Sequence, residues 1–146
     1  MAGSSQRRNG RLVLIAMTLA SVAALACHDG FSPFGLFGTY GLTTVNGKPV
    51  PATLFSDTSF TDVVAGGSLS LTPDGKYLSA VTTNETVDGH LSVYVDTVTG
   101  TWRQSGGALT LTAVDSSQTA ANWNGNSVTV TDSSGASVVI MVFSRR

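Results

Sequence analysis

The sequence has little charge, a single cysteine and, beyond that cysteine, no long segment with the apolar period of a helix. Only 12% of the 146 residues are charged, and eight lysines and arginines stand against nine aspartates and glutamates. Proteins that bind nucleic acid present clustered basic surfaces to the phosphates, so this balance argues against nucleic acid as a partner. Low charge with many small and β-branched residues favours strands and turns over helices.

The single cysteine, Cys27, comes directly after an uncharged run at residues 12–26 that follows three arginines. A helix that spans a bilayer needs about 20 apolar residues, so this run is short for a membrane span. A basic flank, a short apolar run and small residues at its end predict a cleavable export signal that begins as a helix.

The stretch Ala-Ala-Leu-Ala-Cys at residues 23–27 resembles the lipobox of bacterial lipoproteins. The resemblance implies cleavage after Ala26, a lipid on Cys27 and a membrane as partner through that lipid. The alternative is an ordinary signal peptide that leaves a free thiol, which is a liability in an oxidising compartment. We therefore expect an exported, lipid-anchored protein of the cell envelope, on the outer membrane where the cell has two.

These features divide the chain into a signal peptide at residues 1–26, a lipidated cysteine with a tether at residues 27–37, and a β-domain at residues 38–146. Signal removal leaves five basic and nine acidic residues. The tether is rich in phenylalanine, glycine and proline, so we expect part of it to pack on the domain, with the lipid headgroups as the alternative. Lipidation leaves no thiol for a disulfide, so a hydrophobic core must hold the domain together.

Apolar and polar residues alternate through much of the domain, and Asn-Gly, Asp-Gly and Gly-Gly turns separate the alternating segments. Such alternation predicts strands with one buried face, and Asn-Gly and Asp-Gly favour tight antiparallel hairpins. We predict ten candidate strands, at residues 38–45, 59–64, 68–72, 76–84, 90–97, 100–105, 108–114, 119–123, 127–132 and 137–143.

An open sheet of this many strands would leave two bare edges, and closure removes them. We therefore predict an all-β fold, an antiparallel up-and-down meander that closes into a small barrel of about eight to ten short strands. Residues 38–54, the glycine-rich strand starts and the Gly-Thr-Trp at residues 100–102 resemble the small lipocalin-like domains of bacterial lipoproteins. The resemblance implies a calyx.

No residue pattern predicts catalysis, a metal site or a cofactor. A serine nucleophile needs a histidine base within reach, but beyond the signal peptide the histidines are His28 in the tether and His90 beside a turn. Zinc takes three or four cysteine, histidine or acidic ligands, and the acidic residues fall mostly in turns. We therefore expect no enzyme activity.

Binding is the function class that the sequence leaves open. Five aromatic residues are candidates to line a ligand pocket, with ordinary core packing as the alternative: Tyr40, Tyr77, Tyr94, Trp102 and Trp123. The apolar run at residues 137–143 offers a second feature, in which we expect Val139, Met141 and Phe143 to face outward as an interaction strip.

These features support two main hypotheses and a weaker third. The first is a non-catalytic lipoprotein whose barrel binds a small apolar ligand, and a cavity of several hundred Å3 would favour it. The second is a structural or interaction protein with a packed barrel that contacts another envelope protein. The third is a small-barrel inhibitor of a secreted hydrolase.

Overall fold

The computed structural model describes residues 35–133, 135 and 137–146. Predictions about the signal peptide, Cys27 and most of the tether concern residues outside this part. Within it, no helix is long and apolar enough to cross a membrane. The ten strands are β1 (Gly38–Val45), β2 (Lys48–Pro49), β3 (Ala52–Ser56), β4 (Phe60–Leu71), β5 (Lys76–Val87), β6 (His90–Ser105), β7 (Ala108–Ala113), β8 (Gln118–Trp123), β9 (Ser127–Asp132) and β10 (Val139–Arg145).

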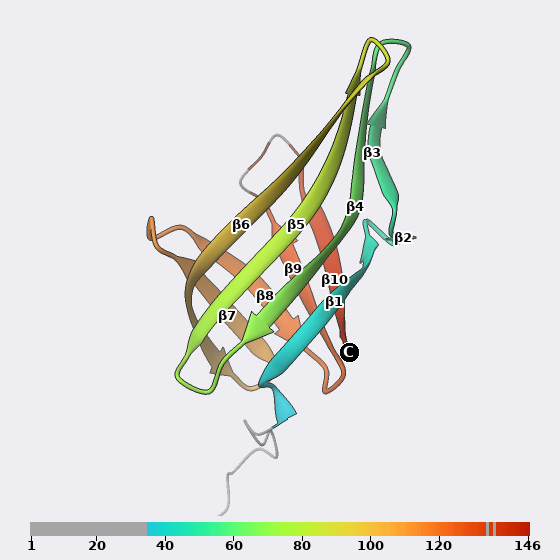
Figure 1. Ribbon diagram of the computed structural model, residues 1–146. Coiled ribbons are helices and arrows are strands. Elements are labelled where there is room, and N and C mark those ends of the chain that lie inside the picture. The colour runs from blue at the N-terminus through green and yellow to red at the C-terminus, as the bar shows by residue number, and fades with distance from the viewer. Residues whose placement is uncertain (1–34, 134, 136) are drawn as a thin grey trace, which may run out of the picture. The chain divides into compact units, whose positions relative to one another are not determined.

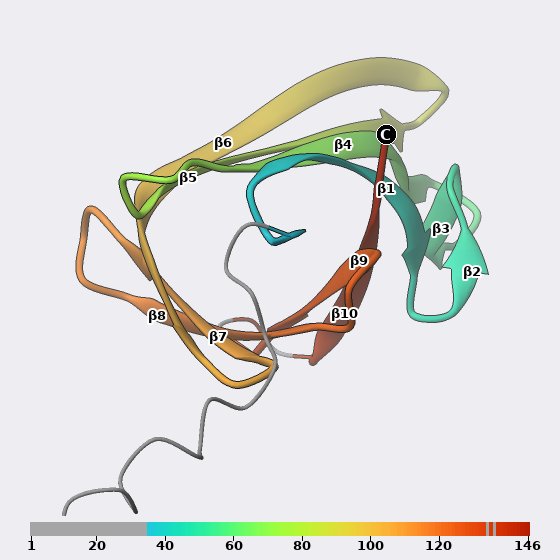
Figure 2. The same ribbon diagram turned by 90° about the horizontal axis from the view of Figure 1, so that it is seen from below.

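Eight of the strands close into an antiparallel barrel. Neighbours along the chain pair from β4 to β10, and β1 closes the ring by pairing with both β10 and β4. Figure 2 shows the strands as a ring, seen from below. The short strands β2 and β3 lie in the connection between β1 and β4, and β3 pairs with the part of β4 beyond β1. The predicted all-β meander and its closure are confirmed.

Two hairpin turns have the geometry that their sequences predict. Asn46 and Gly47 have φ values of 50° and 77°, and Asp88 and Gly89 have φ values of 49° and 80°. Positive φ at both central residues is what a type I′ turn requires, and its twist matches that of the flanking strands. These dipeptides therefore fix the hairpins that join β1 to β2 and β5 to β6.

Strands β4 and β6 are longer than predicted, because each joins two predicted strands into one. The residues between those predicted strands continue the strand. At Gly100, a Cβ atom would lie 2.0 Å from the carbonyl oxygen of Thr112 on β7. The glycine here allows a close approach of the backbones of β6 and β7.

The core inside the barrel contains the apolar residues that the alternation predicted in β4, β7 and β9. Leu69, Leu109 and Val128 are buried, and the two tyrosines Tyr40 and Tyr77 join them. Partly buried Val50, Val81, Trp102, Val139 and Met141 pack against this cluster. Burial of these side chains is the main stabilising contribution to a domain without disulfides.

The expected orientation of the last strand is wrong. Phe143 lies in the core at 1% exposure and Met141 packs against it, whereas Ile140 is exposed. The backbone register explains this, because Phe143 is opposite both Val128 on β9 and Leu42 on β1. An uninterrupted apolar run does not specify which face is buried, and a shift of one residue exchanges the faces. Residues Val139, Met141 and Phe143 therefore do not form an outward strip.

Strands β4, β5 and β6 extend past the rest of the ring as a long ribbon, with β3 beside them (Figure 1). Here too the burial differs from the prediction. Leu91, Val93 and Val95 were expected on a dry face, but they are 63%, 59% and 62% exposed. The ribbon lies beyond the core, so alternation alone did not reveal which face, if either, would be buried.

Candidate functional site

One end of the barrel, here called the plugged end, is closed by residues 35–37, which precede β1 (Figures 1 and 2). Leu36 is fully buried, and its carbonyl oxygen accepts a 2.6 Å hydrogen bond from the phenol of Tyr40. The Nη2 atom of Arg145 donates to the carbonyl oxygen of Phe37 at 2.9 Å and to that of Gly35. This part of the tether therefore packs on the domain as expected.

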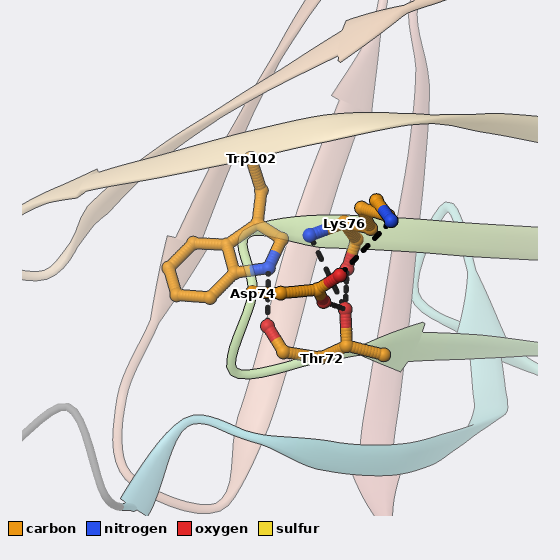
Figure 3. Close-up of polar contacts among 4 residues, drawn as sticks. All are labelled: Thr72, Asp74, Lys76 and Trp102. Carbon is orange, nitrogen blue, oxygen red and sulfur yellow. Dashed lines mark hydrogen bonds and ion pairs between the residues drawn. The ribbon is translucent and has the colours of Figure 1, made fainter.

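The turn between β4 and β5 lies at the same end and is tied together by polar contacts (Figure 3). The Thr72 hydroxyl donates to Asp74 Oδ1 at 2.5 Å and to the Lys76 carbonyl oxygen at 2.8 Å. The indole Nε1 of Trp102 donates to the carbonyl oxygen of Thr72 at 3.1 Å, and the Trp102 ring packs against Phe37 with centroids 5.8 Å apart. Trp102 therefore links this turn to the plug.

A cavity of about 440 Å3 lies toward the other end, here called the cavity end, where β7 and β9 finish and β8 begins. A smaller chamber of about 110 Å3 adjoins it. The two share five lining residues from β5, β6, β8 and β9, which shows that they are parts of one space: Tyr77, Asp96, Val98, Thr119 and Asp132.

The two chambers differ in the chemistry of their lining. Apolar side chains line the smaller chamber, among them Val81, Leu111, Val130 and Met141. The larger chamber is bounded by hydroxyl and amide groups, including Ser117 and Gln118. Asp96 and Asp132 border both chambers. The cavity thus combines apolar walls with two acidic residues.

Tyr77 is the aromatic residue that lines both chambers. Burial raises the pKa of its phenol above the usual value of 10.0, and the Asp115 carboxylate raises the pKa further. Both causes disfavour the phenolate, the first by desolvation and the second by repulsion of negative charge. At neutral pH the side chain is therefore an uncharged hydrogen-bonding group in the cavity wall.

The other aromatic candidates lie elsewhere. Tyr40 and Trp123 are buried in the core, and Trp102 is at the plugged end. Tyr94 is 52% exposed on the ribbon formed by β5 and β6. The structure therefore brings one of the five predicted residues, Tyr77, to the cavity.

Sequence reasoning missed the two carboxylates that border the cavity. Asp96 alternates with Val95 and was assigned to the wet face of its strand, opposite a presumed dry face. On β5 the cavity residue Val81 is the pairing partner of Asp96, and Ser79 is that of Val98. Residues 90–99 of β6 are exposed on both faces, so Asp96 borders the cavity as an exposed side chain, as its expected wet face implies.

Among the residues in the described ranges, no three histidine, cysteine or acidic side chains are grouped closely enough to hold a metal ion. No protein-family model matches the chain, and the search of curated proteins finds no relative.

Proposed function

We propose that this protein is a lipid-anchored, non-catalytic binding module of the bacterial cell envelope. Its ligand is a small molecule with an apolar body and a positively charged group. The observation that supports this most strongly is the cavity of about 440 Å3 at one end of the barrel. Ligand pockets usually have about 300–1,000 Å3, and a fully packed barrel would offer no such space.

The lining favours an amphipathic cation over the purely apolar ligand that the sequence suggested. Apolar ligands gain affinity from contact with walls such as those formed by Leu111 and Val130. Two carboxylates in the same space attract positive charge and repel negative charge. An alkylamine has an apolar chain that fits the apolar walls and an ammonium group that fits the acidic residues.

The anchor is proposed from the lipobox resemblance at residues 23–27. Cys27 precedes Gly35 by eight residues, and residue 35 belongs to the plug. A lipid on Cys27 would therefore join the domain through its plugged end, leaving the cavity end available to ligands. Bacterial lipoproteins carry several acyl chains, which is what stable anchoring requires.

The test uses the Cys27→Ser protein, which has no acceptor for the lipid, purified without detergent. Calorimetric titration with octylammonium and with octanoate compares two probes that have similar tails and opposite charge. We expect octylammonium to bind and octanoate to bind at least tenfold more weakly. Hydrogen bonds to charged groups contribute about 1.5–3 kcal/mol, so Asp96→Asn or Asp132→Asn should weaken octylammonium binding about 10- to 100-fold.

Asp88→Asn is the matched control. Asp88 lies in the β5–β6 turn with φ of 49°, outside the cavity lining, and asparagine tolerates positive φ. This variant should bind octylammonium like the parent protein. Equal affinity for the two probes, or no binding of octylammonium, would contradict the proposed ligand class.

A further inference from the structure

Strand β6 has a long free edge. It pairs with β5 along residues 90–101, whereas on its other side β7 pairs only with residues 100–105. The backbone of Thr99 is also occupied on that side, because its carbonyl oxygen accepts a hydrogen bond from Val114 N at 3.2 Å. In the part of the chain that the structure describes, no strand pairs with residues 90–98 along this edge.

The direction of the unpaired backbone groups follows from two hydrogen bonds. The Thr99 carbonyl points toward the β7 side, and Trp102 N points the other way, toward Gly75 O. The register with β5 has no bulge, so peptide groups alternate in direction along β6. Leu91, Val93, Val95 and Thr97 therefore present both N–H and C=O to the free edge.

This edge has only one of the features by which proteins prevent edge-to-edge pairing, the charged side chain of Asp96. The other features are prolines, lysines, bulges and very short strands. Residues 90–98 contain no proline and no lysine, and Asp96 is the only acidic residue among them. Their exposed aliphatic side chains Leu91, Val93 and Val95 form one row on the outer face. An edge of this kind is a site for strand addition.

We propose that residues 90–96 of β6 pair antiparallel with the same residues of a second copy, about a two-fold axis at Val93. This register places Val93 opposite Val93 and Leu91 opposite Val95 of the second copy. All three residues present their backbone groups to the edge, so each facing pair exchanges two hydrogen bonds. A two-fold axis makes the contact self-complementary and limits it to a dimer.

The length of the free edge selects this register. With the axis at Val93, the turn residues Asp88 and Gly89 of one copy lie beside residues 98 and 97 of the other. Pairing ends there, directly before Thr99, whose backbone already bonds Val114. An axis at Tyr94 would place the turn residue Gly89 of one copy beside Thr99 of the other. An axis at Ser92 would place Val95 beside Gly89, so Val95 would have no strand residue opposite it.

Side-chain pairing supports the same register. On the inner face of the ribbon, His90 of each copy lies opposite Asp96 of the other, and these are the only acid and the only histidine in residues 90–98. An imidazole N–H donates a hydrogen bond to a carboxylate. An axis at Asp96 would instead place two carboxylates directly opposite each other, which destabilises a sheet.

Sedimentation of the Cys27→Ser protein, in a series up to about 1 mM, tests whether the dimer forms. We expect a dimer, and we expect Val93→Pro to make the protein monomeric without unfolding it, because the lost N–H points to the free edge. Val93→Lys should do the same by placing like charges opposite each other. Val138→Lys is the control, since Val138 is equally exposed at 56% and lies outside β6.

Disulfide formation tests the register. In the Cys27→Ser background, which has no other cysteine, Val93→Cys should form a disulfide dimer on mild oxidation. Facing residues of a hydrogen-bonded pair have Cα atoms about 5.5 Å apart, which a disulfide spans. Leu91→Cys faces Val95 of the second copy and should link far more slowly. A monomer at every concentration, a Val93→Pro dimer, or equal linking of both cysteine variants would overturn the proposal.

Discussion

The phenol of Tyr40 donates a 2.6 Å hydrogen bond to the carbonyl oxygen of Leu36, and this contact joins the plug to the first strand of the barrel. Both side chains are fully buried. Residues 35–37 are thus part of the domain, as expected for part of the tether.

Tyr40→Phe should destabilise the domain by about 1–3 kcal/mol, because a buried carbonyl loses its donor. Denaturant unfolding measures the change as a lower midpoint with an unchanged slope. Tyr94→Phe removes the hydroxyl of an exposed tyrosine and should leave the midpoint within error. Equal midpoints for Tyr40→Phe and the parent protein would show that the plug is not held by this bond.

Gly100→Ala should destabilise the barrel by about 1–3 kcal/mol or more, because the added Cβ would meet the Thr112 carbonyl oxygen at 2.0 Å and force β6 and β7 apart. Gly66→Ala is the control, since a Cβ at Gly66 meets no atom within 4 Å. Thermal unfolding of the two variants should separate them clearly. Similar melting temperatures for the two variants would show that the backbones of β6 and β7 do not approach closely at Gly100.

Phe143→Ala should cost about 3–5 kcal/mol of unfolding free energy, as expected for a buried aromatic residue. Ile140→Ala, on the opposite face of β10, should cost much less because Ile140 is 43% exposed. Chemical denaturation of the pair tests the corrected orientation of this strand. A larger loss for Ile140→Ala would restore the orientation first expected.

The raised pKa of Tyr77 predicts a loss of stability in alkaline solution. The folded state holds the phenolic proton more tightly than the unfolded chain does. The stabilisation that comes from the protonated Tyr77 is therefore complete below pH 10 and is lost as pH rises through the raised pKa. Unfolding midpoints across this range should fall more steeply for the parent protein than for Tyr77→Phe. Parallel profiles would show that Tyr77 titrates normally.

The sequence was enough to predict the fold because most strands carry local evidence. Asn46-Gly47 and Asp88-Gly89 specify hairpin turns, and the alternation around Leu69, Leu109 and Val128 specifies a buried face. These signals agree with one another, which is the condition for a sequence to specify one structure.

The candidate site was harder to predict, because the sequence does not show which face of each strand lines the cavity. Phe143 was misplaced because an apolar run has no period, and its face follows from long-range pairing with β1 and β9. Asp96 is exposed as expected, but that it borders a cavity follows from the pairing of β6 with β5. Local alternation does not contain that information.

The position of octylammonium in a crystal structure of the complex tests the central claim most directly. We expect the ammonium group to lie beside Asp96 and Asp132, with the alkyl chain directed toward Leu111 and Val130. A cavity filled by protein side chains, or an octylammonium bound outside the barrel, would contradict it.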